Sequence, residues 1–215
     1  MDHKMTLARH QEQLLADYAE KNKSAHKGQI LFVGSSLMEQ FPIEEFVKEL
    51  DLPYAVYNRG IGGYVISQLK AALNTCVLDL EPSRIFINIG TNDLTVAEWT
   101  TESVIAHYEA LLRQILSALP SARITLMAYY PINIDAAIEQ IKPALRIRSN
   151  ERINEANRQV EALAKKLGLR YIDVNDALKD EQGRLKAEYT KEGMHIKPEG
   201  YRAIMPALLP YLQEV

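Results

Sequence analysis

The stretch "ILFVGSSLMEQFP", residues 30–42, decides the fold because it leads from a buried strand through a polar turn into a helix. The four apolar residues 30–33 follow one another without interruption, which is typical of a strand covered on both faces in a parallel sheet. Gly34, Ser35 and Ser36 come next and open a segment with helical spacing. The two hydroxyls at this turn either cap the helix or include a nucleophile.

The same alternation of apolar runs and helical segments continues along the chain. Short runs rich in branched and aromatic residues predict buried strands at 29–33, 54–58, 84–89, 123–129 and 169–174. Apolar residues spaced three and four apart predict helices at 5–22, 103–119, 149–168 and 200–214. We expect Pro206 and Pro210 to interrupt the last helix. Strands alternating with helices indicate an α/β fold, with a parallel sheet of about five strands covered by helices on both faces.

Length and composition favour one globular domain. The chain has 215 residues, 47% of them hydrophobic and 25% charged, which is enough for a substantial core. No repeat or linker divides it, so we expect a single domain over residues 1–215, with residues 1–28 as an N-terminal helical extension packed on it. The formal net charge of −3 and the scattered basic residues argue against nucleic-acid binding. Cys76 is the only cysteine, which excludes an intramolecular disulfide and a multi-cysteine metal site.

The sequence predicts a cytoplasmic protein without a cofactor. No apolar run approaches the ~20 residues of a membrane span, and the polar N-terminal segment does not resemble a cleavable signal. Motifs for a phosphate-binding loop, a dinucleotide or a zinc protease site do not occur. We therefore expect neither a nucleotide nor a catalytic metal.

Residues suited to ester chemistry follow the predicted strands. In open parallel sheets, ligands bind beyond the carboxyl ends of the strands. The first strand leads into the turn Gly34, Ser35 and Ser36, the second into "NRGIGGY" with Gly63, and the third into "GTNDL" with Asn92. Near the C-terminus, "KEGMHIKPEGY" places Glu192 three residues before His195. A serine, backbone donors, an amide, a histidine and a carboxylate are what acyl transfer requires.

Taken together, these blocks resemble the SGNH hydrolases, the GDSL-like esterases and lipases, and especially bacterial members related to platelet-activating-factor acetylhydrolase. The resemblance covers roughly residues 29–213 and rests on four blocks in the family order. It implies a three-layer α/β/α fold of flavodoxin-like type. It further implies a nucleophile, a base with its acid, and oxyanion-hole donors, which match Ser36, His195 with Glu192, and Gly63 with Asn92. A small acyl group such as acetyl is implied by the resemblance alone.

Two residues depart from the family pattern. Ser35 stands where the family usually has aspartate, and we expect it to be structural. Glu192 stands where an aspartate usually orients the histidine, and it keeps the charge while adding a methylene. Glutamate serves as the triad acid in other serine hydrolases. The substitution therefore keeps the negative charge and changes only the geometry of the contact with His195.

The chemistry of the proposed roles also follows from the residue types. A serine hydroxyl needs a base within about 2.6–3.2 Å to take its proton during attack, and His195 is the proposed base. Glu192 would accept the other imidazole N–H. The backbone N–H groups of Ser36 and Gly63 and the Asn92 amide would stabilise the oxyanion. We expect Asp93 to support its turn.

The sequence leaves several alternatives open. A thioesterase or lysophospholipase would share the mechanism, and a binding module could keep the fold without turnover. A flavin- or phosphate-binding protein would use the 34–37 turn instead. The oligomeric state, including a homodimer, and the contribution of the irregular segment 130–148 are not fixed by the sequence. Trp99, Tyr129 and Tyr130 either line the acyl pocket or pack in the core or at the rim of the site.

Overall fold

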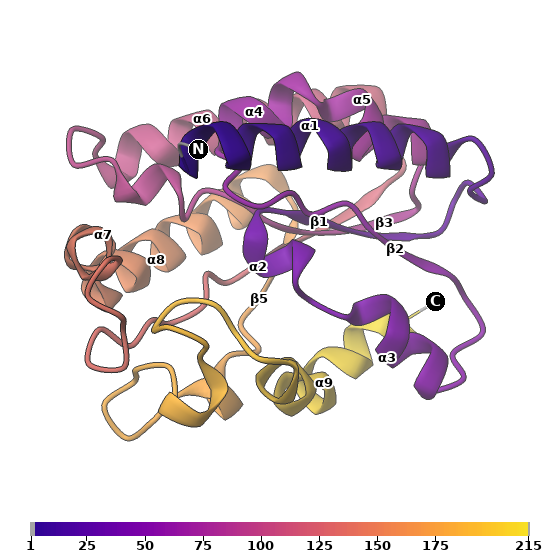
Figure 1. The fold of residues 1–215 in the computed structure, drawn as a ribbon. Coiled ribbons are helices and arrows are strands. Elements are labelled where there is room, and N and C mark those ends of the chain that lie inside the picture. The colour runs from indigo at the N-terminus through magenta and orange to yellow at the C-terminus, as the bar shows by residue number, and fades with distance from the viewer. Residues whose placement is uncertain (1–2, 215) are drawn as a thin grey trace. The chain divides into compact units, whose positions relative to one another are not determined.

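The computed structural model describes residues 3–214 and contains a five-stranded parallel sheet (Figure 1). Residues 1–2 and 215, which the predicted domain includes, lie outside the described residues. The strands are β1 (Ile30–Gly34), β2 (Val56–Asn58), β3 (Arg84–Asn88), β4 (Arg123–Met127) and β5 (Arg170–Ile172). Their order in the sheet is β2-β1-β3-β4-β5. All five predicted strands are confirmed, each within two residues of its expected ends.

The position of β1 between two other strands explains its uninterrupted apolar run. Every residue of this strand is buried, and it pairs in parallel with β2 on one side and β3 on the other. The ring of Phe32 stacks on that of Phe86 in β3, with centroids 4.8 Å apart. Gly34 pairs with Asn88, and a Cβ at Gly34 would lie 2.0 Å from the Asn88 carbonyl oxygen. Only glycine therefore allows the strand to end so close to β3.

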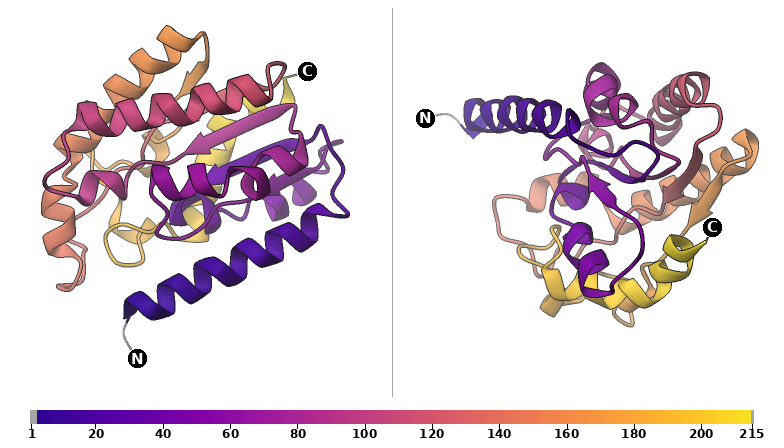
Figure 2. Two further views of the ribbon diagram at one scale, coloured as in Figure 1. Left: turned by 90° about the horizontal axis from the view of Figure 1, so that it is seen from above. Right: turned by 90° about the vertical axis from the view of Figure 1, so that its right-hand side faces the viewer.

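Two compact units make up the described chain. The first contains the residues up to Asp93 together with Ala106–Thr125, and the second contains Leu94–Ile105 and the residues from Leu126 onward. The helices of the first unit are α1 (His3–Asn22), α2 (Ser36–Glu39), α3 (Ile43–Glu49), α4 (Ile66–Ala71), α5 (Leu73–Cys76) and most of α6 (Thr101–Ala118). Helices α1, α4 and α5 lie on one face of β1–β3, whereas α2 and α3 lie on the other (Figures 1 and 2). This unit therefore has three layers.

The second unit carries the remaining helices, α7 (Lys142–Ile147), α8 (Asn150–Leu167) and α9 (Pro198–Gln213). Helix α8 packs on β5, and its ends are those that the sequence predicts. The Ser149 hydroxyl accepts the backbone N–H of Arg152 at its start, and Gly168 closes it in the left-handed conformation with φ 67°. Serine at the N-cap and glycine after the last turn are the residues that these positions favour.

Two expectations about the second unit need correction. Pro206 and Pro210 do not interrupt the last helix, because α9 continues through both. The prolines are four residues apart and both are exposed, so they lie on the same, solvent-facing side of the helix. The irregular segment 130–148 also contains a short helix, α7. Among the described residues, no helix combines the length and hydropathy needed to cross a bilayer.

Candidate active site

The turn after β1 presents Ser36 at the first position of α2. Ser35 is the N-cap residue, and its backbone carbonyl accepts the N–H groups of Met38 and Glu39 at 3.0 and 2.9 Å. The Ser35 side chain is 1% exposed, and its hydroxyl has no hydrogen-bond partner among the described residues. The capping interpretation therefore fails for the Ser35 hydroxyl. The backbone of Ser35 starts the helix, and Ser36 is the first residue within it.

A glycine-rich loop after β2 lies next to Ser36. The backbone N–H of Ile61 donates to the Gly34 carbonyl at 3.0 Å, which holds the start of this loop against the end of β1. A Cβ at Gly62 would lie 3.8 Å from the Cβ of Ser36. Gly63 has φ +75°, in the left-handed region that glycine adopts without strain. The structure thus brings the predicted glycine block and the predicted nucleophile together.

The turn after β3 is bonded to the segment that follows the glycine loop. Asn92 donates its side-chain N–H to the Tyr64 carbonyl at 2.9 Å. The Asp93 carboxylate accepts the backbone N–H of Ile66, the first residue of α4, with oxygen distances of 3.3 and 3.2 Å. Asp93 is fully buried, and this burial raises the pKa of its carboxyl group to about 6, with the Ile66 hydrogen bond partly offsetting the effect. Asp93 therefore supports the turn, as the sequence predicts.

In the second unit, Glu192 and His195 form a close pair. The Glu192 Oε1 atom lies 2.6 Å from Nδ1 of His195 and also accepts the backbone N–H of His195 at 3.1 Å. A carboxylate at Nδ1 holds the proton there and leaves Nε2 as the basic nitrogen. The Thr190 hydroxyl tightens the turn, because it accepts the Gly193 N–H at 2.8 Å and donates to the His195 carbonyl at 3.1 Å. The longer glutamate side chain thus reaches the histidine within this turn.

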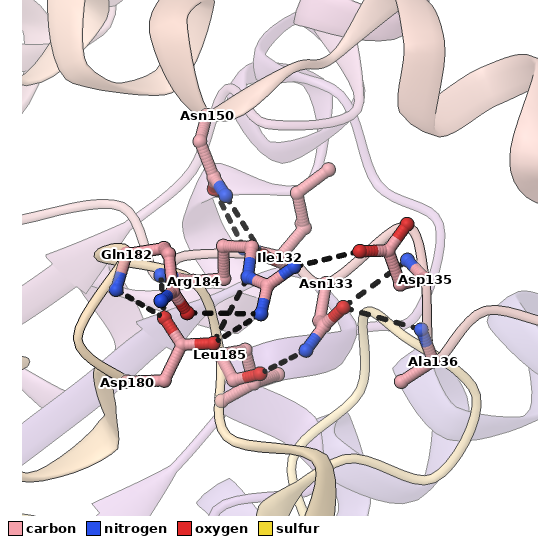
Figure 3. A network of polar contacts seen from close by, with 9 residues as sticks. All are labelled: Ile132, Asn133, Asp135, Ala136, Asn150, Asp180, Gln182, Arg184 and Leu185. Carbon is pink, nitrogen blue, oxygen red and sulfur yellow. Dashed lines mark hydrogen bonds and ion pairs between the residues drawn. The ribbon is translucent and has the colours of Figure 1, made fainter.

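The segment 130–148 supports this acid–histidine turn. The backbone N–H of Asn133 donates to the Gly193 carbonyl at 2.8 Å. The Asn133 side chain is buried and donates to the Leu185 carbonyl at 2.8 Å, while its oxygen accepts two backbone N–H groups of its own loop (Figure 3). Burial lowers the pKa of the Arg148 guanidinium to about 10, and the nearby Glu192 carboxylate partly offsets this shift. Segment 130–148 is therefore packed against the turn.

Several other candidate residues belong to the core. Tyr129 and Tyr130 are each 1% exposed, which favours the core-packing alternative for both, whereas Trp99 is half-buried. Cys76 is fully buried, and burial raises the pKa of its thiol to about 12, so it is not a nucleophile. No group of three His, Cys, Asp or Glu side chains suited to a metal ion occurs in the part of the chain that the structure describes.

Comparison with known families decides how these groups are interpreted. The profile of the GDSL-like Lipase/Acylhydrolase family matches residues 37–203, which is more than half of the chain and begins directly after Ser36. The chain belongs to this GDSL-like family. It is accordingly a carboxylic ester hydrolase, and the resemblance inferred from the four sequence blocks is confirmed at the level of the family.

Individual relatives of this GDSL-like hydrolase agree in sequence and in fold. A provisionally named platelet activating factor from Streptococcus pneumonia has 31% identity and a TM-score of 0.85, covering 97% of this chain and 95% of its own. The platelet-activating factor acetylhydrolase IB subunit alpha2 of Rattus norvegicus is 26% identical over 183 residues, which are 83% of this chain and 73% of the rat protein. An acetyl-xylooligosaccharide esterase from Geobacillus, 18% identical with a TM-score of 0.66, covers 88% of this chain and 96% of its own and shares the fold.

Sequence reasoning missed the residues of the GDSL-like hydrolase that hold the glycine loop. Gln11 of α1 donates its side-chain N–H to the Gly62 carbonyl at 2.7 Å. Glu39, in the last position of α2, accepts the Gly62 backbone N–H. Fifty-one positions separate Gln11 from Gly62, and no spacing rule connects residues so far apart.

Proposed function

We propose that the chain hydrolyses esters of short acyl groups, such as acetyl, through an acyl-enzyme on Ser36. His195 would be the general base, Glu192 would orient it, and Gly63 and Asn92 would contribute to the oxyanion hole with the Ser36 backbone N–H. The observation that carries the proposal is the 2.6 Å contact between Glu192 and Nδ1 of His195 in a chain of the GDSL-like family. Such a pair has the geometry that a serine hydrolase needs to keep Nε2 basic.

The proposed reaction has two halves. Nε2 of His195 takes the Ser36 hydroxyl proton while Oγ attacks the ester carbonyl carbon, and the carbonyl oxygen becomes an oxyanion. Three N–H donors, two from the backbone and one from the Asn92 amide, stabilise that charge. The intermediate collapses as imidazolium protonates the leaving alcohol. Water, deprotonated by the same imidazole, then attacks the acyl-enzyme and releases the carboxylic acid and Ser36. The mechanism requires Nε2 of His195 to come within hydrogen-bond distance of Ser36 Oγ.

The names of the relatives support a serine mechanism on acetyl esters. Three structures of the Geobacillus stearothermophilus acetylxylan esterase are of catalytic mutants, at a serine, an aspartate and a histidine, and the last two residues are three positions apart. Glu192 and His195 have the same separation. That esterase and the platelet-activating factor acetylhydrolase are both named for acetyl groups. We further propose that the described residues work as one catalytic domain that takes a small-molecule ester and no cofactor.

A chain-length panel on purified protein tests the proposal. We expect turnover of p-nitrophenyl acetate, a decline in kcat/KM toward the butyrate and octanoate esters, and a loss of more than about 10³-fold in kcat for Ser36→Ala. Ser24→Ala, an exposed serine in the same unit, should match the wild type. Turnover that survives Ser36→Ala would contradict the nucleophile, and absence of turnover with every ester would favour a binding module. A preference for octanoyl esters or for thioesters would indicate the lysophospholipase or thioesterase alternative.

A further inference from the structure

The N-terminal helix contacts the loop that carries the proposed oxyanion donor. Gln11 Nε2 donates to the Gly62 carbonyl oxygen at 2.7 Å. This carbonyl and the Gly63 N–H belong to the same peptide group, so a hydrogen bond to one end acts on the other. Leu7, one helical turn before Gln11, covers the same glycine, because a Cβ at Gly63 would lie 3.0 Å from its side chain and 3.0 Å from Gln11 Nε2.

The preceding peptide group is held by a side chain of α2. Glu39 Oε2 accepts the Gly62 backbone N–H, and Glu39 Oε1 lies 2.9 Å from Nε2 of His10. Gly62 therefore has both its N–H and its carbonyl engaged by side chains. Since glycine has no side chain to restrict its backbone, these two hydrogen bonds define how the next peptide group is oriented.

The Gln11 amide is itself oriented, and α1 is fixed elsewhere along its length. Gln68 Nε2 is 3.5 Å from Gln11 Oε1, which points Gln11 Nε2 toward the loop. Two turns further along α1, the Tyr18 hydroxyl donates to the Gly60 carbonyl at 2.7 Å. Asn22 accepts two hydrogen bonds from the buried Arg59 guanidinium, at 3.0 and 2.9 Å. Replacing the Gln11 side chain alone therefore leaves the helix docked.

We propose that Gln11 is a positioning residue for the oxyanion hole, acting through the Gly62–Gly63 peptide group. This inference rests on the proposed function, because it assumes that the Gly63 N–H donates to the oxyanion. A hydrogen bond to the carbonyl polarises the peptide group and strengthens its N–H as a donor. It also fixes the plane of the group before the substrate carbonyl becomes charged, and such preorganisation is the main source of oxyanion stabilisation. Gln11 touches no reacting atom in this scheme.

The kinetic test uses three variants of exposed or half-buried positions on α1. We expect Gln11→Ala to lower kcat for p-nitrophenyl acetate about 3- to 10-fold, the usual effect of one hydrogen bond, with KM within twofold. Gln11→Glu keeps the size but cannot donate to the carbonyl, so we expect at least an equal loss of kcat. Gln13→Ala is the matched control, because Gln13 bonds Asp17 within the same helix and faces solvent. An unchanged kcat in Gln11→Ala would overturn the inference.

An amide NMR measurement separates this inference from the proposed function. In Gln11→Ala, but not in Gln13→Ala, we expect the Gly63 amide resonance to shift, because the substitution removes the hydrogen bond to the carbonyl of the same peptide group. The Gly62 amide, which keeps its Glu39 partner, is the internal reference. The same measurement is made in a Ser36→Ala background, which has no turnover if the proposed function is right. Full activity of Ser36→Ala would refute the proposed nucleophile while the NMR comparison still shows whether Gln11 orders the loop. An unperturbed Gly63 amide would refute the Gln11 contact itself, whatever the nucleophile.

Discussion

At the scale of a residue, Glu192 shows how the turn accommodates an acid that is one methylene longer than aspartate. Glu192 bonds both the backbone N–H and Nδ1 of His195 with the same oxygen atom. The Glu192 side chain reaches the ring from three residues away, so its position depends on the backbone of the turn. The Thr190 hydroxyl stabilises this turn by accepting the Gly193 N–H and donating to the His195 carbonyl. The sequence identifies the residue types, whereas the fit of the longer acid depends on this local backbone.

The charge of Glu192 is predicted to matter beyond its hydrogen bond. Glu192→Gln keeps an oxygen and the length, but it removes the negative charge that stabilises imidazolium and allows the amide to select the other imidazole tautomer. We expect kcat for p-nitrophenyl acetate to fall by at least about 10²-fold with little change in the melting temperature. Glu188→Gln, an exposed glutamate nearby in the sequence, is the control. A loss below threefold would show that the carboxylate is not part of the catalytic machinery.

At the scale of elements, the sequence predicted what local chemistry determines and missed what tertiary packing determines. The β1 run ends at Gly34 and α8 ends at Gly168, as expected, because strand burial and helix caps leave local signatures. The prediction was wrong for the prolines of α9, because the free-energy cost of a proline within a helix depends on which side of the helix faces water. The contact of α1 with the glycine loop has no local signature at all.

The sequence did not predict how segment 130–148 packs. In the structure, Asn133 anchors this segment. Its buried amide makes three hydrogen bonds to backbone groups, and its backbone N–H holds Gly193. Truncation to alanine removes one buried hydrogen bond to the Leu185 carbonyl and two partly buried ones from backbone N–H groups, and a buried polar group left without a partner costs about 1–3 kcal/mol. We therefore expect Asn133→Ala to lower the free energy of unfolding in urea by roughly 2–4 kcal/mol.

A neighbouring residue of the same network provides the control for Asn133. Asp135 pairs with Arg184 at 2.6 Å, but its side chain is 74% exposed (Figure 3). Exposed ion pairs contribute about 0–1 kcal/mol, so Asp135→Ala should change stability by less than about 1 kcal/mol. Equal effects of the two substitutions would mean that the buried amide does not anchor the segment.

At the scale of the whole molecule, the carboxylate that links two loops also makes stability depend on pH. Asp93 is fully buried and joins the turn after β3 to the start of α4. The pKa of its carboxyl group is about 6 in the folded protein, against 3.8 as its ordinary value. The folded state therefore binds this proton more tightly than the unfolded state, and the stabilisation is complete below pH about 4 and lost as pH rises through 6.

Comparison of the wild type with Asp93→Asn isolates this effect, because asparagine keeps an acceptor for the Ile66 N–H and stays neutral at every pH. Between pH 7.5 and pH 4.5, we expect the stability of the wild type relative to the variant to increase by about 2 kcal/mol. Urea unfolding of both proteins at several pH values measures the difference and cancels the titration of the other carboxylates. A difference that stays constant would mean that the Asp93 pKa is the same in the folded and unfolded chains. If the stability of the wild type relative to the variant instead decreases as pH falls, the hydrogen bonds to the ionised carboxylate outweigh the effect of its burial.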